Sequence, residues 1–107
     1  MAFILLVEDE KLIRWGFRRA LESRGHVVDE AASLEQAEGH LRDHRPDVLI
    51  LDIRLPDGNG VDFMIEQKAS LSESFVIVIT ASGAAETAVR AMKAGAVDFL
   101  SKPLSEE

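Results

Sequence analysis

The stretch Val48–Gly58, which reads VLILDIRLPDG, decides the fold. Four apolar residues lead directly into the carboxylate of Asp52, and a turn with Pro and Gly follows. Continuous rather than alternating apolarity is typical of a strand that is buried on both faces, as in parallel sheets covered by helices. Such a strand presents Asp52 at the rim of the sheet, where a ligand can reach it. The segment alone also allows a second interpretation, in which Asp52 caps the turn or the next helix.

The same pattern recurs along the chain. Two more continuous apolar runs of strand length lie at Phe3–Val7 and Phe75–Ile79, and two weaker ones lie at His26–Glu30 and Val97–Ser101. Apolar residues at helical spacing, and glycines where a helix should stop, predict helices between the strands. The predicted helical segments are Lys11–Arg24, the segment between Ser33 and Pro46, Val61–Ile65 and Ala84–Lys93.

This alternation of strands and helices predicts one parallel sheet with helices on both faces. The three fully apolar strands are expected in the centre of the sheet and the two weaker ones at its edges. Right-handed crossovers then favour the strand order 2-1-3-4-5. The predicted fold is therefore α/β, a doubly wound five-stranded parallel sheet of the flavodoxin-like kind.

Composition excludes several classes of protein. The 107 residues include 12 Lys and Arg against 19 Asp and Glu, a formal charge of −7, whereas direct nucleic-acid binding needs a basic patch. The absence of Cys excludes disulfides and thiolate metal sites. No apolar run approaches the length of a membrane span, and the segment Met1–Val7 is too short for a signal peptide. We therefore expect one acidic domain in the cytoplasm, with no direct binding to nucleic acid or membrane.

The predicted fold brings polar residues together at one edge of the sheet. Ligands of such sheets bind beyond the carboxyl ends of the strands, where the winding reverses. Like charges about 4 Å apart repel by roughly 4 kcal/mol at an effective dielectric constant of ~20, so clustered carboxylates favour a bound divalent cation. Oxygen ligands with open positions suit Mg²⁺ or Mn²⁺. The residues that follow the strands are Glu8, Asp9, Asp52, Thr80 and Lys102.

Two of these five residues, Thr80 and Lys102, are not carboxylates and indicate phosphate chemistry. Lys102 supplies a positive charge that can pair with Asp52 or with a phosphate, and Thr80 supplies a hydroxyl for a phosphate oxygen. A carboxylate, a divalent ion, a cation and a hydroxyl together make a phosphoryl-transfer site. Carboxylates also serve as nucleophiles in covalent catalysis, which makes Asp52 a candidate for an acyl phosphate.

Over essentially its whole length the chain resembles the receiver domain of two-component response regulators. Five motifs in the right order and spacing carry the resemblance: LVEDE at Leu6–Glu10, LDIRLPDG at Leu51–Gly58, ITA at Ile79–Ala81, AGAVDF at Ala94–Phe99 and Lys102-Pro103. The phrases LIRW at Leu12–Trp15 and AVRAMKAGAVDF at Ala88–Phe99 are most similar to receivers of nitrogen-regulator-type transcription activators.

The resemblance implies roles for the acidic residues. It implies that Asp52 is the phosphoacceptor and that Asp9 binds Mg²⁺ directly, with Asp52 and the backbone carbonyl of Arg54 as further ligands. Glu8 stands at the second acidic position, where the family often has Asp. Lys102 is similar to the family's phosphate-binding lysine. The implied phosphoryl donor is the phosphohistidine of a histidine kinase or a phosphotransfer protein.

The resemblance also implies a switch. Thr80 would move to bond the phosphoryl group, and the ring of Phe99 would fill the vacated space, so that phosphorylation selects between two arrangements of the fourth helix and fifth strand. Arg54 and Ser82 occupy the positions that tune dephosphorylation. Such a domain promotes its own phosphorylation and dephosphorylation without being a turnover enzyme. A receiver domain acts on an output domain, so the resemblance implies that this chain is part of a longer transcriptional regulator.

The first helix carries a second, separate stripe of residues. Its core face is predicted to hold Ile13, Phe17, Ala20 and Leu21. Leu12 and Trp15 lie off that face, and in this family the kinase docks near the first helix. We therefore predict that Leu12 and Trp15 contact the kinase, whereas partial cover of Trp15 by a neighbouring side chain is the alternative.

The chain departs from the family after Lys102-Pro103, where a fifth helix usually follows and only Leu104–Glu107 remain. Residues 1–107 are thus expected to form a C-terminally truncated receiver. Apolar surface of the first, third and fourth strands should be uncovered, which favours a homodimer or lowered stability. Two alternatives to the main interpretation are a phosphorylation-independent interaction module and a small flavodoxin-like enzyme. The second lacks a Gly-rich phosphate loop after the first strand.

Overall fold

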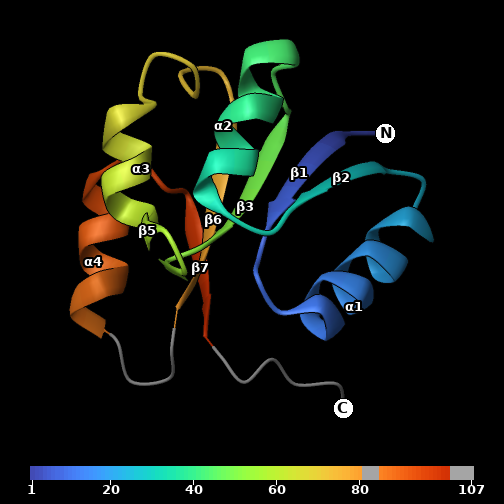
Figure 1. Cartoon of the computed structure of the whole chain (residues 1–107), viewed down its shortest axis with the longest axis horizontal. Coiled ribbons are helices and arrows are strands. Elements are labelled where there is room, and N and C mark those ends of the chain that lie inside the picture. The colour runs from blue at the N-terminus through green and yellow to red at the C-terminus, as the bar shows by residue number, and fades with distance from the viewer. Residues whose placement is uncertain (81–84, 102–107) are drawn as a thin grey trace.

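A five-stranded parallel sheet organises the computed structural model, which describes residues 1–80 and 85–101 (Figure 1). Its strand order, β2-β1-β3-β6-β7, confirms the predicted flavodoxin-like order, because β6 and β7 are the fourth and fifth strands of this sheet. The three continuous apolar runs form its centre, and the two weaker strands form its edges. The strands are β1 (Phe3–Val7), β2 (Val27–Ala31), β3 (Val48–Asp52), β6 (Phe75–Thr80) and β7 (Asp98–Ser101).

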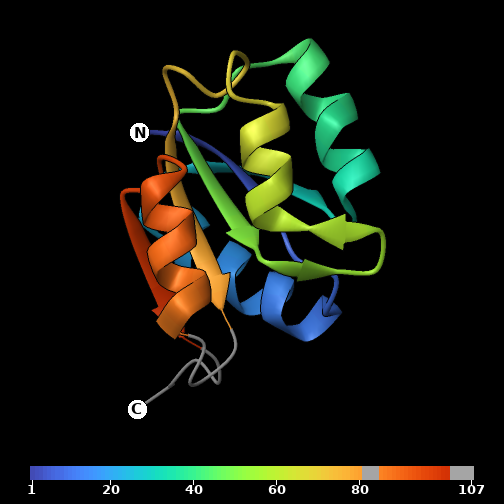
Figure 2. The ribbon, with the colours of Figure 1, turned by 90° about the vertical axis from the view of Figure 1, so that its left-hand side faces the viewer.

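The four helices of the described residues cover the two faces of the sheet unequally. Figure 2 shows α2, α3 and α4 over the face toward the viewer, with α1 behind the sheet. Gly25, with φ of +90°, supports the predicted left-handed stop after the first helix, although α1 ends before Arg24. Ser33 caps α2, since its side chain accepts a hydrogen bond from the Gln36 N–H at 3.2 Å. The helices are α1 (Lys11–Glu22), α2 (Leu34–Asp43), α3 (Gly60–Glu66) and α4 (Ala85–Lys93).

The two faces of the sheet explain why the strands are continuously apolar. Successive side chains of a strand point to opposite faces, so a strand between two helical layers needs apolar residues at every position. Leu5 and Val7 of β1 lie in the larger core, together with α2, α3 and α4. Ile4 and Leu6 of the same strand lie in the smaller core, against α1.

The α1 side corrects one expectation and part of another. Ala20 is exposed rather than part of the core face, because α1 packs on the sheet through the narrow stripe that includes Phe17 and Leu21. On this side Ile4 and Leu6 of β1 and Ile50 of β3 are buried, since they pack with each other and with α1, and Val48 is partly buried. On β6, the fourth strand of the sheet, Phe75 is 62% exposed, which agrees with the expectation for that strand, and Leu100 of the edge strand β7 is 36% exposed. Self-association stays a prediction.

A small antiparallel hairpin follows β3 where the sequence indicated only a turn. It consists of β4 (Arg54–Leu55) and β5 (Gly58–Asn59), with Arg54 paired to Asn59. The Asn59 side chain then accepts hydrogen bonds from the Val61 and Asp62 N–H groups at 2.8 and 3.2 Å, which caps α3. The hairpin therefore links the end of β3 directly to the start of the next helix.

Within the described residues, none of the helices combines the length and the apolarity that a membrane span would require.

Candidate functional site

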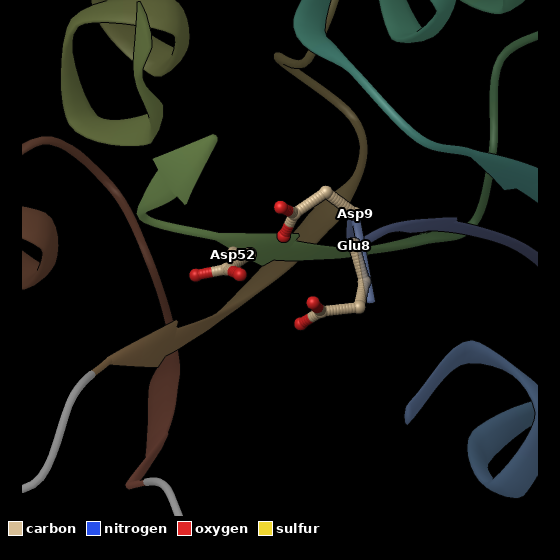
Figure 3. Close-up of side chains that lie close together, drawn as sticks. All are labelled: Glu8, Asp9 and Asp52. Carbon is tan, nitrogen blue, oxygen red and sulfur yellow. The ribbon is translucent and has the colours of Figure 1, made fainter. Parts of the chain in front are cut away.

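Three carboxylate side chains meet at the carboxyl edge of the sheet. Glu8 and Asp9 follow β1, and Asp52 ends the neighbouring strand β3. Figure 3 shows the three side chains converging from these two strands, and their carboxylates offer oxygen atoms within 4.8 Å of one another. Three of the five residues that were expected to meet at this edge, Glu8, Asp9 and Asp52, therefore do lie together.

The three acids differ in burial and in what holds them. Glu8 is 0% exposed and Asp52 is 2% exposed, whereas Asp9 is exposed to solvent. The Glu8 Oε2 atom accepts a hydrogen bond from the Glu10 N–H at 2.9 Å, and the Asp52 Oδ1 atom accepts one from the Arg54 N–H at 3.1 Å. Each buried carboxylate is thus bonded to a backbone amide two residues further along the chain.

The donor set fits a hard divalent cation. All three groups are oxygen ligands, and Mg²⁺ prefers a few carboxylate oxygens together with water or phosphate. Concentrated negative charge in a largely buried position is costly unless a cation compensates it. The longer side chain of Glu8 still reaches the cluster, so the replacement of the Asp that is common at this position does not remove an oxygen from it.

An arginine network supports the end of β1 and was not predicted from the sequence. The Arg14 side chain donates from Nη1 to the backbone carbonyl of Glu8 at 2.7 Å and from Nε to Glu30 at 2.9 Å. Arg18 donates to the other Glu30 oxygen at 2.6 Å and to Glu22 at 2.8 Å. The hydrogen bonds from Arg18 and then Arg14 hold the pKa of the Glu30 carboxyl below its usual range.

Gly60 packs directly on the backbone that carries Asp52. Its N–H donates to the Ile53 carbonyl at 2.7 Å. A Cβ atom at this position would lie 2.8 Å from the Asp52 carbonyl oxygen and 3.0 Å from the Ile53 Cα atom. Only glycine fits this approach without a shift of the backbone. The Asn59-Gly60 dipeptide is a general turn signal, but it does not say which backbone Gly60 contacts.

Thr80 and Phe99 lie on neighbouring strands next to α4. Thr80 ends β6 and is 2% exposed, while Phe99 on β7 is 42% exposed. Both side chains line one open, mainly apolar hollow of about 300 Å³ between α4 and β7. The Val89 and Met92 side chains of α4 also line it. The two residues of the predicted switch therefore border the same space.

The remaining candidate residues lie apart from this cluster or outside the described part of the chain. Leu12 is 82% exposed and Trp15 is 58% exposed on α1, and the Arg19 guanidinium lies 4.8 Å from the centre of the Trp15 ring. Trp15 is thus exposed but partly covered by Arg19, which agrees with the alternative, and contact of Leu12 and Trp15 with the kinase stays a prediction. Lys102 and Ser82 lie outside the described residues.

Comparison with known proteins identifies the class to which this fold and site belong. A family model for the response regulator receiver domain matches residues 4–107. The chain therefore belongs to the response regulator receiver domain family, whose members are phosphorylation-activated switches of two-component signalling.

Individual relatives agree with this assignment. The alginate biosynthesis transcriptional regulatory protein AlgB of Pseudomonas aeruginosa is 43% identical over 104 residues, which are 97% of this chain and 23% of AlgB. The KDP operon transcriptional regulatory protein KdpE of Escherichia coli is 42% identical over 103 residues, which are 96% of this chain and 45% of KdpE. A crystal structure of NtrX from Brucella abortus matches with a TM-score of 0.90 and 35% identity over 97% of this chain and 24% of the NtrX chain.

The chain thus spans 23% of AlgB and 45% of KdpE. These two transcriptional regulatory proteins are almost equally similar to it. The narrower assignment to nitrogen-regulator-type receivers stays a prediction.

Proposed function

We propose that this chain accepts a phosphoryl group on Asp52 and thereby changes the surface formed by α4 and β7. The observation that carries the proposal is the carboxylate of Asp52 at the end of β3, within 4.8 Å of carboxylate oxygens from Glu8 and Asp9. A nucleophile at the rim of a doubly wound sheet lies where ligands of such sheets bind.

The transfer itself is a displacement at phosphorus. A carboxylate oxygen of Asp52 attacks the phosphorus atom of a phosphohistidine, the new P–O bond forms and the P–N bond breaks. The imidazole nitrogen leaves with the electron pair and then takes up a proton. The product is an acyl phosphate on Asp52, which water later hydrolyses to restore the carboxylate and release inorganic phosphate. The chain promotes both steps on itself and is not a turnover enzyme.

Asp9 and Asp52 are proposed to hold Mg²⁺, or Mn²⁺ in its place, with Glu8 and the backbone carbonyl of Arg54 completing the site. The bound ion would supply charge neutralisation at the phosphoryl oxygens. The carboxylate cluster and its fit to an oxygen-liganded cation support this assignment. Lys102 is proposed to pair with the phosphoryl group, as an ammonium group commonly does with phosphate.

Thr80 and Phe99 are proposed to form the switch. A phosphoryl group on Asp52 adds close to two negative charges, and the Thr80 hydroxyl is able to bond one of its oxygens. Since Thr80 and Phe99 border one hollow, a movement of Thr80 changes the space that is open to the Phe99 ring. Arg54 and Ser82 are proposed to tune how fast the acyl phosphate is hydrolysed.

The chain is proposed to act in the cytoplasm, and its proposed partners are a histidine kinase or phosphotransfer protein and an output domain. The exposed Leu12 and Trp15 side chains of α1 are the proposed kinase contacts. AlgB and KdpE are named as transcriptional regulatory proteins, which supports a transcriptional output domain in a longer protein.

The test is phosphorylation by a small-molecule acyl phosphate in the presence of Mg²⁺, followed by intact-mass measurement. The wild-type chain should gain the mass of one phosphoryl group, and Asp52→Asn should gain none. Asp57→Asn is a matched control, because it makes the same change in an exposed side chain of the adjacent hairpin turn and should still be phosphorylated. A folded wild-type chain that gains no mass would contradict the proposal and favour the phosphorylation-independent interaction module.

A further inference from the structure

The turn that carries Asp9 is held by three hydrogen bonds, one for each consecutive peptide group. The Glu8 N–H donates to the Ala31 carbonyl at 3.0 Å, so it extends the pairing of β1 with β2. The Glu8 carbonyl accepts from Arg14 Nη1 at 2.7 Å. The Glu10 N–H donates to Glu8 Oε2 at 2.9 Å. The second bond is the one that comes from a side chain outside the turn.

That second bond determines where Asp9 lies. A peptide group is planar, so the orientation of the Glu8 carbonyl also sets the direction of the bond to the Asp9 nitrogen and the position of the Asp9 Cα atom. Asp9 is the exposed member of the carboxylate cluster, and burial therefore does not hold its side chain in place. Its backbone must be held instead if its carboxylate is to stay near those of Glu8 and Asp52.

Arg14 is itself held firmly enough to do this. Its side chain is only 16% exposed, and its Nε atom is bonded to Glu30 Oε1 at 2.9 Å. Glu30 lies on β2 and also receives Arg18, so the carboxylate that anchors Arg14 is bonded at both oxygens. A planar guanidinium with two anchored nitrogen atoms has little freedom to turn.

We propose that Arg14 is a positioning residue for the cation site: it fixes the peptide group between Glu8 and Asp9 and thereby keeps the Asp9 carboxylate in the cluster. This inference rests on the proposed function, in which Asp9 is a Mg²⁺ ligand. The ligand concerned is the divalent cation alone, and no contact of Arg14 with the phosphoryl group is involved.

Charge and position predict opposite effects of removing Arg14. Loss of the positively charged Arg14 side chain near three carboxylates should strengthen the binding of Mg²⁺, because the guanidinium repels the ion. Loss of a group that orients a metal ligand should weaken it, and outer-shell partners of metal ligands typically contribute roughly 10–100-fold in affinity. The sign of the change in affinity therefore separates the two roles.

Arg18→Gln is the matched control. Like Arg14→Gln, it removes one positive charge and one hydrogen bond to Glu30, but Arg18 does not bond to the Glu8 carbonyl. A purely structural role, in which the arginines tie α1 to β2, predicts that both variants unfold at lower temperature and that neither loses affinity for Mg²⁺ when folded.

The experiment is a Mg²⁺ titration of wild type and variants at constant ionic strength, followed by the backbone amide shifts of the folded protein. Arg14→Gln should bind Mg²⁺ roughly tenfold more weakly than wild type, and Arg18→Gln should bind it at least as tightly as wild type. Arg14→Gln with an affinity equal to or above that of Arg18→Gln would overturn the inference. A wild-type chain that binds no Mg²⁺ would overturn the proposed metal site itself, which keeps the two failures distinct.

Arg14→Lys decides the matter if Arg14→Gln does not fold. A single ammonium group keeps the charge but cannot bond the Glu8 carbonyl and Glu30 in the forked arrangement of a guanidinium. The affinity of Arg14→Lys for Mg²⁺ should therefore be lower than that of wild type. Wild-type affinity in Arg14→Lys would overturn the inference.

Discussion

The carboxylate of Asp57 accepts a hydrogen bond from the backbone N–H of Leu34 at 3.0 Å, although the two residues lie 23 positions apart. The other carboxylate oxygen accepts from the Glu35 N–H at 3.0 Å. The hairpin that follows Asp52 is thus tied to the first turn of α2, where backbone N–H groups lack partners within the helix. Through this pair, the loop next to the proposed phosphoacceptor is joined to a helix on the larger core.

Asp57→Ala should lower the free energy of unfolding by about 1 kcal/mol at neutral pH, a typical effect for loss of a helix cap. The hydrogen bonds from the Leu34 and Glu35 N–H groups hold the pKa of the Asp57 carboxyl below its usual range. The stabilisation is therefore complete above the pKa of an unfolded aspartate, about 3.9, and is lost as the pH falls through the lower folded pKa. Urea unfolding at several pH values should show the difference from wild type shrinking only in acid.

Asp43→Ala is the control for this change. Asp43 ends the same helix at its carboxyl end, where a negative charge is unfavourable with the helix dipole. Its removal should not destabilise the protein. A difference between wild type and Asp57→Ala that does not change with pH would show that the carboxylate charge contributes nothing.

Gly60→Ala should destabilise the protein by roughly 1–3 kcal/mol, as overpacking of a tight contact does. The added methyl group would lie 2.8 Å from the Asp52 carbonyl oxygen, so the strand end that carries the proposed nucleophile must shift. Acyl-phosphate labelling should be slower as well. Urea unfolding and intact-mass kinetics measure the two effects.

Gly16→Ala provides the matched comparison. Gly16 lies within α1, and apart from its chain neighbours and the helix's own backbone no atom lies within 4 Å of an added Cβ atom there. This change should stabilise the protein by up to about 1 kcal/mol because alanine restricts the unfolded chain. Equal stabilisation by Gly60→Ala would mean that the contact with Asp52 is looser than the structure shows.

Mg²⁺ should raise the unfolding temperature of the wild-type chain, and removal of Mg²⁺ by a chelator should reverse the effect. A ligand at about 100 times its dissociation constant adds about 2.7 kcal/mol to the free energy of unfolding. Asp9→Asn should lose most of this Mg²⁺-dependent gain, while its stability without Mg²⁺ should equal or exceed that of wild type, because one of three clustered charges is gone. Asp43→Asn should retain the gain. Thermal unfolding with and without Mg²⁺ measures these changes. An equal rise in unfolding temperature for Asp9→Asn and wild type would refute the metal site.

Thr80→Ala should still be phosphorylated on Asp52 but should not transmit the change to Phe99. The variant keeps the proposed nucleophile and cation ligands and removes the hydroxyl that is proposed to bond the phosphoryl group. Amide shifts of β7 and α4, recorded before and after labelling, should change in wild type and stay nearly constant in Thr80→Ala. Thr87→Ala, a change of the same kind within α4 at a residue that does not line the hollow, should respond like wild type. A full response in Thr80→Ala would exclude Thr80 as the switch.

The sequence by itself determined the sheet and the place of the carboxylates. Strands between two helical layers need apolar side chains on both faces, so the runs at Phe3–Val7 and Val48–Leu51 could be recognised as central parallel strands. The carboxyl ends of parallel strands lie at one edge of the sheet, and this placed Asp9 next to Asp52 before any distance was known. Both conclusions depend on chain direction and periodicity, which are local properties.

Only the tertiary structure decided which side chains hold that site in place. Arg14 is hydrogen-bonded to Glu30, which lies 16 positions away in the sequence, and Asp57 is hydrogen-bonded to Leu34, which lies 23 positions away. No periodic pattern marks such partners, because each bond depends on the distance between a helix and a strand or loop that pack from separate parts of the chain. The exposure of Ala20 follows from the same cause, since spacing predicts one face of a helix and only packing decides how wide the contact is.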